Sequence, residues 1–96
     1  MLKSIISSNI KIKSNDPNNL KKLLDLEVNR HKYDRSESKI TIDEKNQILE
    51  INIFTKDLIA YKATVNNYIN LLELIKKASE VELWVMQIQQ LYINNN

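Results

Sequence analysis

A short polar stretch around residue 35 of this 96-residue chain brings basic and aromatic side chains together. Its basic residues are Arg30, Lys32, Arg35 and Lys39. Tyr33 lies among them, and because cationic groups bind phosphate oxygens while an aromatic ring stacks on a base, the stretch is a candidate RNA contact. Asp34 and Glu37 offset much of this charge, so an ordinary solvated loop is the alternative interpretation.

Acidic side chains and the one histidine are the candidates for proton transfer and metal binding. Three carboxylates, those of Asp43, Glu44 and Glu50, flank a predicted hairpin and could form a general acid and base pair. Carboxylates at solvated strand ends explain this pattern better. His31 has no further metal ligands close to it in the sequence, so we interpret it as a surface or helix-end residue.

The residue types that are missing exclude several classes of function. Gly is absent, so the glycine-rich loops that hold phosphates and dinucleotides cannot be built in their usual form. Cys is absent and His occurs once, which excludes zinc fingers, thiol nucleophiles and disulfide frameworks. Because no nucleophile with a matching base remains, we expect neither an enzyme nor a bound metal or cofactor.

Length and composition predict one small cytoplasmic domain over residues 1–96. The chain is 43% hydrophobic and 27% charged, which is typical of a folded globular domain of this size. Its apolar runs are far shorter than the ~20 residues that cross a bilayer, and the stretch at residues 1–8 is too short for a signal peptide core. The net charge of +2 allows contact with a polyanion without requiring it.

The first third of the chain predicts a strand and then a helix. In residues 6–12, one side carries Ile6, Ser8, Ile10 and Ile12 and the other side carries Ser7, Asn9 and Lys11, which is the pattern of a half-buried strand. Asp16 is a good helix N-cap, and Pro17 is best tolerated at the first helical position. We therefore expect a helix from about Pro17 to about Arg30, with leucines along one side.

The remainder predicts a hairpin and a long helix. Residues 39–43 and 47–54 alternate in the same way, and Asn46 is the expected turn pivot because Asn visits the left-handed region more readily than most residues. From Asp57, a plausible N-cap, the helical pattern runs to about Tyr92. Its last part, residues 80–96, would be a helical extension carrying Trp84, unless the helix breaks near Ser79.

The predicted order of strand, helix, strand, strand and helix indicates an α+β fold. One apolar face per strand favours an antiparallel sheet that two helices cover on one side. Antiparallel pairing throughout places the three strands in the order first, third, second, with the third strand central.

The long helix has more apolar surface than one small sheet can cover. At 100° per residue, one ridge suits the sheet and comprises Leu58, Tyr61, Val65, Ile69 and Leu72. A second ridge comprises Ala60, Ala63, Asn67, Leu71, Leu74 and Ala78, and extends toward Val81. Because its small residues allow another helix to approach closely, this ridge is a candidate partner interface, and coverage by the protein's own first helix is the alternative.

The helix also carries residues typical of one family. Asp57, Ala60, Ala63, Asn66 and Tyr68 stand where the small dimerising subunit of the KEOPS complex has its pattern, and Arg35-Ser36 precedes the hairpin as in that family. The chain resembles this family over roughly residues 5–80. It departs from the pattern at two arginine positions, which are occupied by Lys62 and Asn70, and at Asn67, which replaces a serine.

This resemblance implies a non-catalytic scaffold of the complex that forms threonylcarbamoyladenosine in tRNA. The family's small subunit dimerises, docks its helices on the catalytic subunit and assists tRNA binding. The partners would be the catalytic subunit, a paralogous small subunit, or both, in a homodimer or a heterodimer, and Arg35, Lys39 and Lys62 would contact tRNA. A free-standing nucleic-acid-binding or protein-interaction module is the alternative, although 14 basic and 12 acidic residues argue against a strongly basic face.

Overall fold

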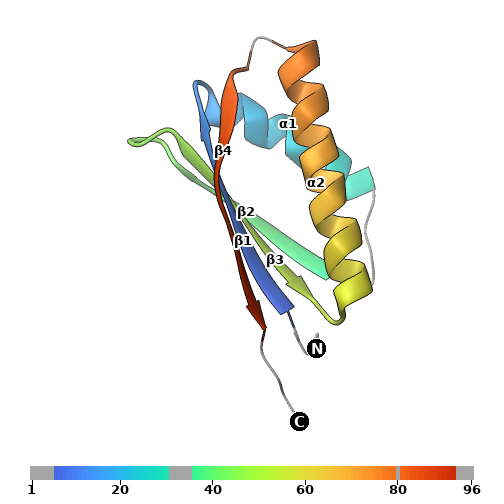
Figure 1. Cartoon of the computed structure of the whole chain (residues 1–96). Helices are drawn as coiled ribbons and strands as arrows, with labels where there is room; N and C mark the ends of the chain where they lie inside the picture. Colours follow the sequence, from blue (N-terminus) through green and yellow to red (C-terminus); the bar gives the residue numbers. More distant parts are fainter. Residues whose placement is uncertain (1–5, 31–35, 80, 93–96) are drawn as a thin grey trace.

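Two layers make up the fold, a four-stranded sheet and two helices on one of its faces (Figure 1). The computed structural model describes residues 6–30, 36–79 and 81–92. The elements are β1 (Ile6–Ser14), α1 (Pro17–Arg30), β2 (Ser36–Asp43), β3 (Ile48–Thr55), α2 (Leu58–Ala78) and β4 (Leu83–Tyr92). All neighbouring strands are antiparallel, in the order β2-β3-β1-β4. The predicted α+β fold with both helices on one face is confirmed.

Alternation along the strands builds the core on the helix side of the sheet. Every second residue of β1 is buried, from Ile6 to Ser14, so the predicted strand is confirmed and is longer than expected. The register places Ile10 opposite Ile51 and Ile12 opposite Leu49, and all four side chains are fully buried. Such apolar pairs across neighbouring strands are the unit that stabilises a sheet.

Helix α1 begins where its capping residues predict. The Asp16 carboxylate accepts a hydrogen bond from the Asn19 amide at 3.2 Å, and Pro17 is the first helical residue. Leu20 and Leu24, one turn apart, are fully buried against the sheet. The cap and the apolar spacing therefore act together, and the bounds predicted for this helix are confirmed.

The hairpin between β2 and β3 turns at a different residue from the one expected. The Asp43 carboxylate accepts hydrogen bonds from the Asn46 amide at 3.3 Å and from its side-chain nitrogen at 2.7 Å. These bonds hold Asn46 within the turn, and the left-handed conformation passes to Gln47, whose φ is 57°. The prediction of Asn46 as the pivot was wrong because its hydrogen bonds to the Asp43 carboxylate hold it in another conformation.

The predicted C-terminal helical extension over residues 80–96 was also wrong for residues 83–92, which form a strand, while residues 80 and 93–96 lie outside the described part of the chain. Helix α2 ends at Ala78, and β4 follows it and pairs with β1 along the whole length of β1. A shift in register between Lys11 and Ile12 leaves Met86 of β4 without an opposite residue, which is a β-bulge. The predicted order of first, third and second strand is present, but β4 lies outside β1, so β3 and β1 share the interior of the sheet.

Hydrogen bonds explain the change from helix to strand. The Ser79 hydroxyl donates to the Ile75 carbonyl at 2.7 Å and accepts from the Val81 amide at 3.2 Å, which ends the helix and redirects the chain. Asn15 then fixes Glu82 through two bonds, one from the Asn15 amide to the Glu82 carbonyl and one from the Glu82 amide to the Asn15 side chain. Beyond them, β4 satisfies backbone groups of β1 that would otherwise lack partners in the sheet.

Replacing Gln47 with Gly should stabilise the protein. A side chain in the left-handed region costs roughly 1–2 kcal/mol, and the greater freedom of Gly in the unfolded chain cancels part of the gain. We expect the free energy of unfolding to rise by about 0.5–1 kcal/mol in urea denaturation. Lys45→Gly, in the same turn at negative φ, is the control and should lower the free energy of unfolding. Equal effects of the two variants on this free energy would contradict the prediction.

Candidate partner interface

Helix α2 is positioned by its cap and by one narrow buried stripe. Asp57 has extended backbone angles, and its carboxylate accepts from the Ala60 amide at 2.8 Å, as an N-cap does. The buried residues are Tyr61, Thr64, Tyr68, Leu72 and Ile75. The ridge predicted to cover the sheet is therefore rotated: Tyr61 and Leu72 belong to the buried stripe, Val65 and Ile69 flank it half-buried, and Leu58 is 44% exposed.

One hydroxyl pair accounts for this rotation. Tyr68 reaches from α2 to β2, where its Oη lies 2.6 Å from the Ser38 Oγ. Burial raises the pKa of the Tyr68 hydroxyl above its ordinary value of 10.0; the Ser38 hydrogen bond lowers this pKa, and the nearby Asp25 carboxylate raises it. The contact holds α2 over β3 and the edge strand β2, so the buried stripe centres on Tyr68 instead of on Val65.

The second predicted ridge remains largely on the surface. Ala63, Asn67 and Ala78 are exposed, Leu74 is 63% exposed, and Ala60 is half-buried. Leu71 is half-buried and packs against the core. Val81, which was expected to extend the ridge, is buried in the protein's own core instead. We call the six residues Ala60, Ala63, Asn67, Leu71, Leu74 and Ala78 the α2 ridge; their spacing of three and four residues suits packing against another helix.

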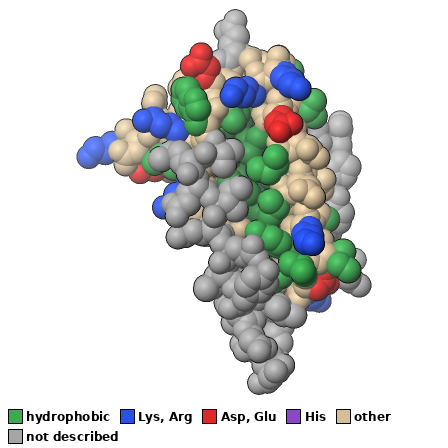
Figure 2. Space-filling model, viewed as in Figure 1, with side chains coloured by type: hydrophobic (Ala, Val, Ile, Leu, Met, Phe, Trp, Pro, Cys, Tyr) green, Lys and Arg blue, Asp and Glu red, His purple; other side chains and the backbone are tan. Residues whose placement is uncertain are grey.

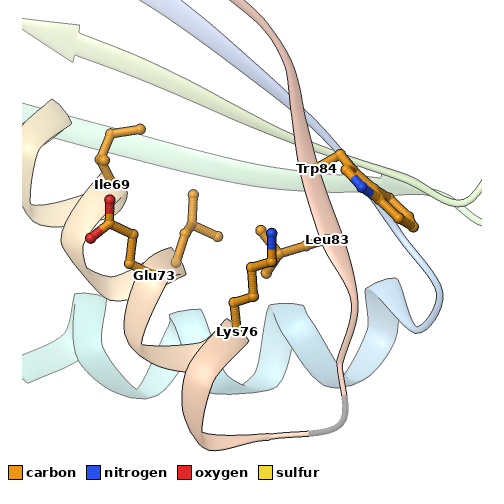
Figure 3. A pocket seen from close by; sticks show the side chains of 6 residues that line it. Ile69, Glu73, Lys76, Leu83 and Trp84 are labelled. Carbon is orange, nitrogen blue, oxygen red and sulfur yellow. The ribbon is translucent and has the colours of Figure 1, made fainter.

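A shallow groove runs along the opposite flank of α2, between this helix and β4 (Figure 3). Its volume is about 290 Å³, and it is lined by Ile69, Leu72, Glu73, Lys76, Leu83 and Trp84. Figure 3 shows Leu83 directed toward α2 and the Trp84 ring on the other side of β4. Sequence reasoning missed the groove because its second wall is the strand that was predicted as helix.

The uncovered face of the sheet carries a polar cluster. The Asn9 side-chain nitrogen donates to the Glu50 carboxylate and, at 2.6 Å, to the Asn52 side-chain oxygen. Glu44 accepts from Asn18 at 3.2 Å, and Asp43 holds the turn as described. The three carboxylates considered as an acid and base pair therefore all accept hydrogen bonds from asparagine side chains, which is a structural role.

The predicted RNA-contacting residues do not come together. Lys39 is exposed on the uncovered face of the sheet, opposite Asn52 in register. Lys62 is exposed on α2, which lies over the other face. Arg35 lies outside the described residues, as do His31 and Tyr33. Lys39 and Lys62 therefore cannot contact the same phosphate group.

Charge on the side of the molecule that Figure 2 shows is mixed and not strongly basic. In Figure 2, the Lys and Arg side chains of the described residues stand apart, with Asp and Glu among them, whereas hydrophobic side chains form a band along α2. Across residues 6–30, 36–79 and 81–92, no group of three or more metal-binding side chains occurs. In that same part of the chain, no helix is long and apolar enough to cross a membrane.

These features define a small α+β domain with a helix that keeps apolar surface outside its own core. The chain matches the model of the family described as transcription factor Pcc1 over residues 9–80. The match begins within β1 and extends just beyond α2, leaving β4 outside it. No curated protein and no solved structure matches the chain.

The chain belongs to the Pcc1 family, the family of the small subunit of the KEOPS complex. This confirms the resemblance that rested on Asp57, Ala60, Ala63, Asn66 and Tyr68. Of these residues, Asp57 caps α2 and Tyr68 fixes its rotation, so part of the pattern is structural. The family is one of non-catalytic subunits that act in complexes with partner proteins.

Tyr68→Phe should weaken the protein and change its response to alkali. Loss of the Ser38 hydrogen bond should lower the free energy of unfolding by about 1 kcal/mol at pH 7. Because the pKa is raised in the folded state, the hydroxyl's contribution is complete below pH 10 and is lost as pH rises through the folded-state pKa. Urea denaturation at pH 7–11 should therefore show a shallower alkaline loss in Tyr68→Phe than in the unmodified protein.

Tyr61→Phe is the matched control, because it removes a phenol from the same buried stripe. It leaves the Ser38–Tyr68 hydrogen bond in place, so it should not reproduce the shallower alkaline loss of Tyr68→Phe. Identical profiles for all three proteins would contradict the role assigned to Tyr68.

Proposed function

We propose that this protein is a non-catalytic scaffold subunit of a KEOPS-type complex, the assembly that forms threonylcarbamoyladenosine in tRNA. It dimerises, docks α2 on a helix of a partner subunit and assists tRNA binding in the cytoplasm. The partner is the catalytic subunit or a paralogous small subunit.

The α2 ridge carries the proposal. It lies entirely within the region that matches the family, and most of it is exposed although half of its positions are alanine. Small side chains allow two helix axes to come within about 8–10 Å, where backbone and side chains of both helices pack. Leu74, 63% exposed, would enter such a contact and lose its contact with water.

This chain contributes to tRNA binding together with neighbouring subunits. The chain's net charge of +2 gives little affinity for a polyanion by itself. Lys39 on the sheet and Lys62 on α2 would each extend basic surface supplied by neighbouring subunits, on different sides of the domain. Arg35 precedes β2 directly in sequence and joins Lys39 in this role.

Ala63→Arg should abolish partner binding and leave the fold intact. Ala63 is exposed, so the larger side chain does not enter the core, but a charged side chain of that length prevents close helix packing. An affinity-tagged chain purified from its native cells should retain KEOPS subunits, identified by mass spectrometry, and the variant should lose them.

Asn66→Arg is the control, because it adds the same side chain on the exposed polar stripe of α2, away from the ridge. It should retain the partners. Loss of the circular-dichroism signal in isolated Ala63→Arg would instead place Ala63 in the protein's own core. Recovery of other proteins and no KEOPS subunits would favour a free-standing interaction module.

Replacing Arg35 and Lys39 together by Ala should weaken tRNA binding by the assembled complex more than by the chain alone. Each phosphate contact contributes to the salt dependence of binding. The slope of log K against log salt should fall by about one to two units in the complex. Lys22 and Lys77, exposed on the helices, are replaced by Ala as the control of equal charge. An unchanged slope in the Arg35 and Lys39 variant would assign the RNA role to partners.

A further inference from the structure

The uncovered face of the sheet carries two exposed aromatic side chains. Trp84 of β4 is 54% exposed, and Phe54 of β3 is 38% exposed. Their sequence neighbours Leu83 and Ile53 are buried on the helix side, so alternation places both rings on the opposite face. Figure 3 shows the Trp84 ring on the side of β4 away from α2. An aromatic ring in this position can stack on a flat group of a ligand.

Three lysines share this face with the two rings. Lys13 of β1 is exposed and stands directly opposite Trp84 in register. Lys11 lies two residues before it on the same side of β1, and Lys39 is exposed on the same face of β2. Lysine ammonium groups bind phosphate oxygens, so this face offers both stacking surfaces and phosphate contacts.

The lysines lie between the rings. Along β1, Trp84 is level with Lys13 and Phe54 is level with Ser7. Two strand spacings of about 4.8 Å and six residues at about 3.4 Å therefore separate the rings by roughly 20 Å. Asn52, opposite Lys39 in register, lies on this path, and its side-chain amide can hydrogen-bond the edge of a base.

The charges of this face decide which kind of nucleic acid suits it. Glu37, Asp43 and Glu50 lie on the same side of β2 and β3 and balance the three lysines. A face without net charge gives little non-specific attraction to a polyanion. Stacking must then supply most of the affinity, and the bases of a duplex are already stacked on each other. The face therefore suits RNA with unpaired bases.

A protein partner suits this face less well. The buried centre of a protein interface is depleted in charged residues, and lysine is among the residues it contains least. Here Lys13 stands beside Trp84, and in the next row Lys11 stands opposite Glu50. A protein that covered Trp84 would have to bury these charges as well.

We propose that the uncovered face of the sheet binds a single-stranded segment of RNA, with bases stacked on Trp84 and Phe54 and phosphates at the three lysines. The inference rests on the proposed function and deepens it, because it gives the RNA contact of Lys39 a defined site and a defined kind of RNA. Strand β4 lies outside the family match, so Trp84 is an addition to the family region. The α2 ridge lies in the helix layer and stays available to a partner subunit.

Intrinsic fluorescence tests the stacking directly, because Trp84 is the only tryptophan in the chain. A single-stranded RNA of about eight nucleotides, added to the purified full chain at low salt, should quench this fluorescence when a base stacks on the indole ring. A blunt RNA duplex of about twice that length should leave the fluorescence largely unchanged. No quenching by the single strand up to about 1 mM, or equal quenching by the duplex, would overturn the proposal.

Side-chain variants separate stacking from charge, with binding of a labelled strand followed by fluorescence anisotropy. Trp84→Leu should weaken binding at least about fivefold, and Trp84→Phe, which keeps a ring, should weaken it less. Leu26→Ala, which removes an exposed side chain from α1, is the control and should bind as the unmodified protein does. Unchanged affinity in Trp84→Leu, with its circular-dichroism spectrum intact, would overturn the proposal.

The salt dependence tests the lysines. Lys13→Ala should lower the slope of log K against log salt by about 0.7, the value of one phosphate contact on a single strand. Lys22→Ala, exposed on α1, is the control of equal charge and should leave the slope unchanged. Equal slopes in the two variants would contradict a phosphate contact at Lys13.

Recovery of KEOPS subunits from native cells separates this inference from the proposed function. Trp84→Leu should retain those subunits, because the α2 ridge is unaltered. Their loss in Trp84→Leu would make the sheet face a protein interface and overturn the inference, while the proposed function would stand. Quenching by RNA without any KEOPS subunits bound to the unmodified chain would overturn the proposed function and leave the sheet face as the RNA site of a free-standing module.

Discussion

The apolar strip on the helix side of β1 and β3 is the constraint on which the rest of the structure depends. Ile10, Ile12, Leu49, Ile51 and Ile53 are fully buried there, and burying such side chains is the main source of stability in a small domain. The strip needs cover along its whole length, and α1 and α2 together supply it. Each helix uses only one narrow stripe for this purpose, so most of the surface of α2 remains outside the core.

The division of α2 into a buried stripe and an exposed ridge connects packing to function. A partner helix must find a face that stability does not already use, and the ridge is such a face because Tyr68 turns the helix toward Ser38. Alanine at three of its six positions adds little to the domain's own stability but allows close approach. In the proposed function, this ridge is the surface that binds a partner subunit.

Strand β4 changes the edges of the sheet. It lies beyond the region that matches the family, and it is joined to β1 by continuous backbone pairing and to Asn15 by two bonds at its start. A strand edge is a surface on which other chains can pair, so covering one edge restricts association to the other. Both helices therefore belong to the region that matches the family, whereas the strand that closes this edge lies outside it.

The sequence by itself determined the elements whose signals are local. Alternation defined β1, β2 and β3, Asp16 and Asp57 capped the two helices, and the order of the first three strands followed from antiparallel pairing.

Three features were decided only by the tertiary structure. The sequence of residues 83–92 is compatible with a helix or with a strand. These residues form a strand because they pair with the edge of β1 that β3 leaves uncovered. The rotation of α2 depends on Tyr68 meeting Ser38, 30 residues away in sequence. Lys39 and Lys62 lie on different sides of the sheet. Alternation along β2 determines the side of Lys39, and the packing of α2 on the other face determines the side of Lys62, so the sequence alone does not relate the two positions.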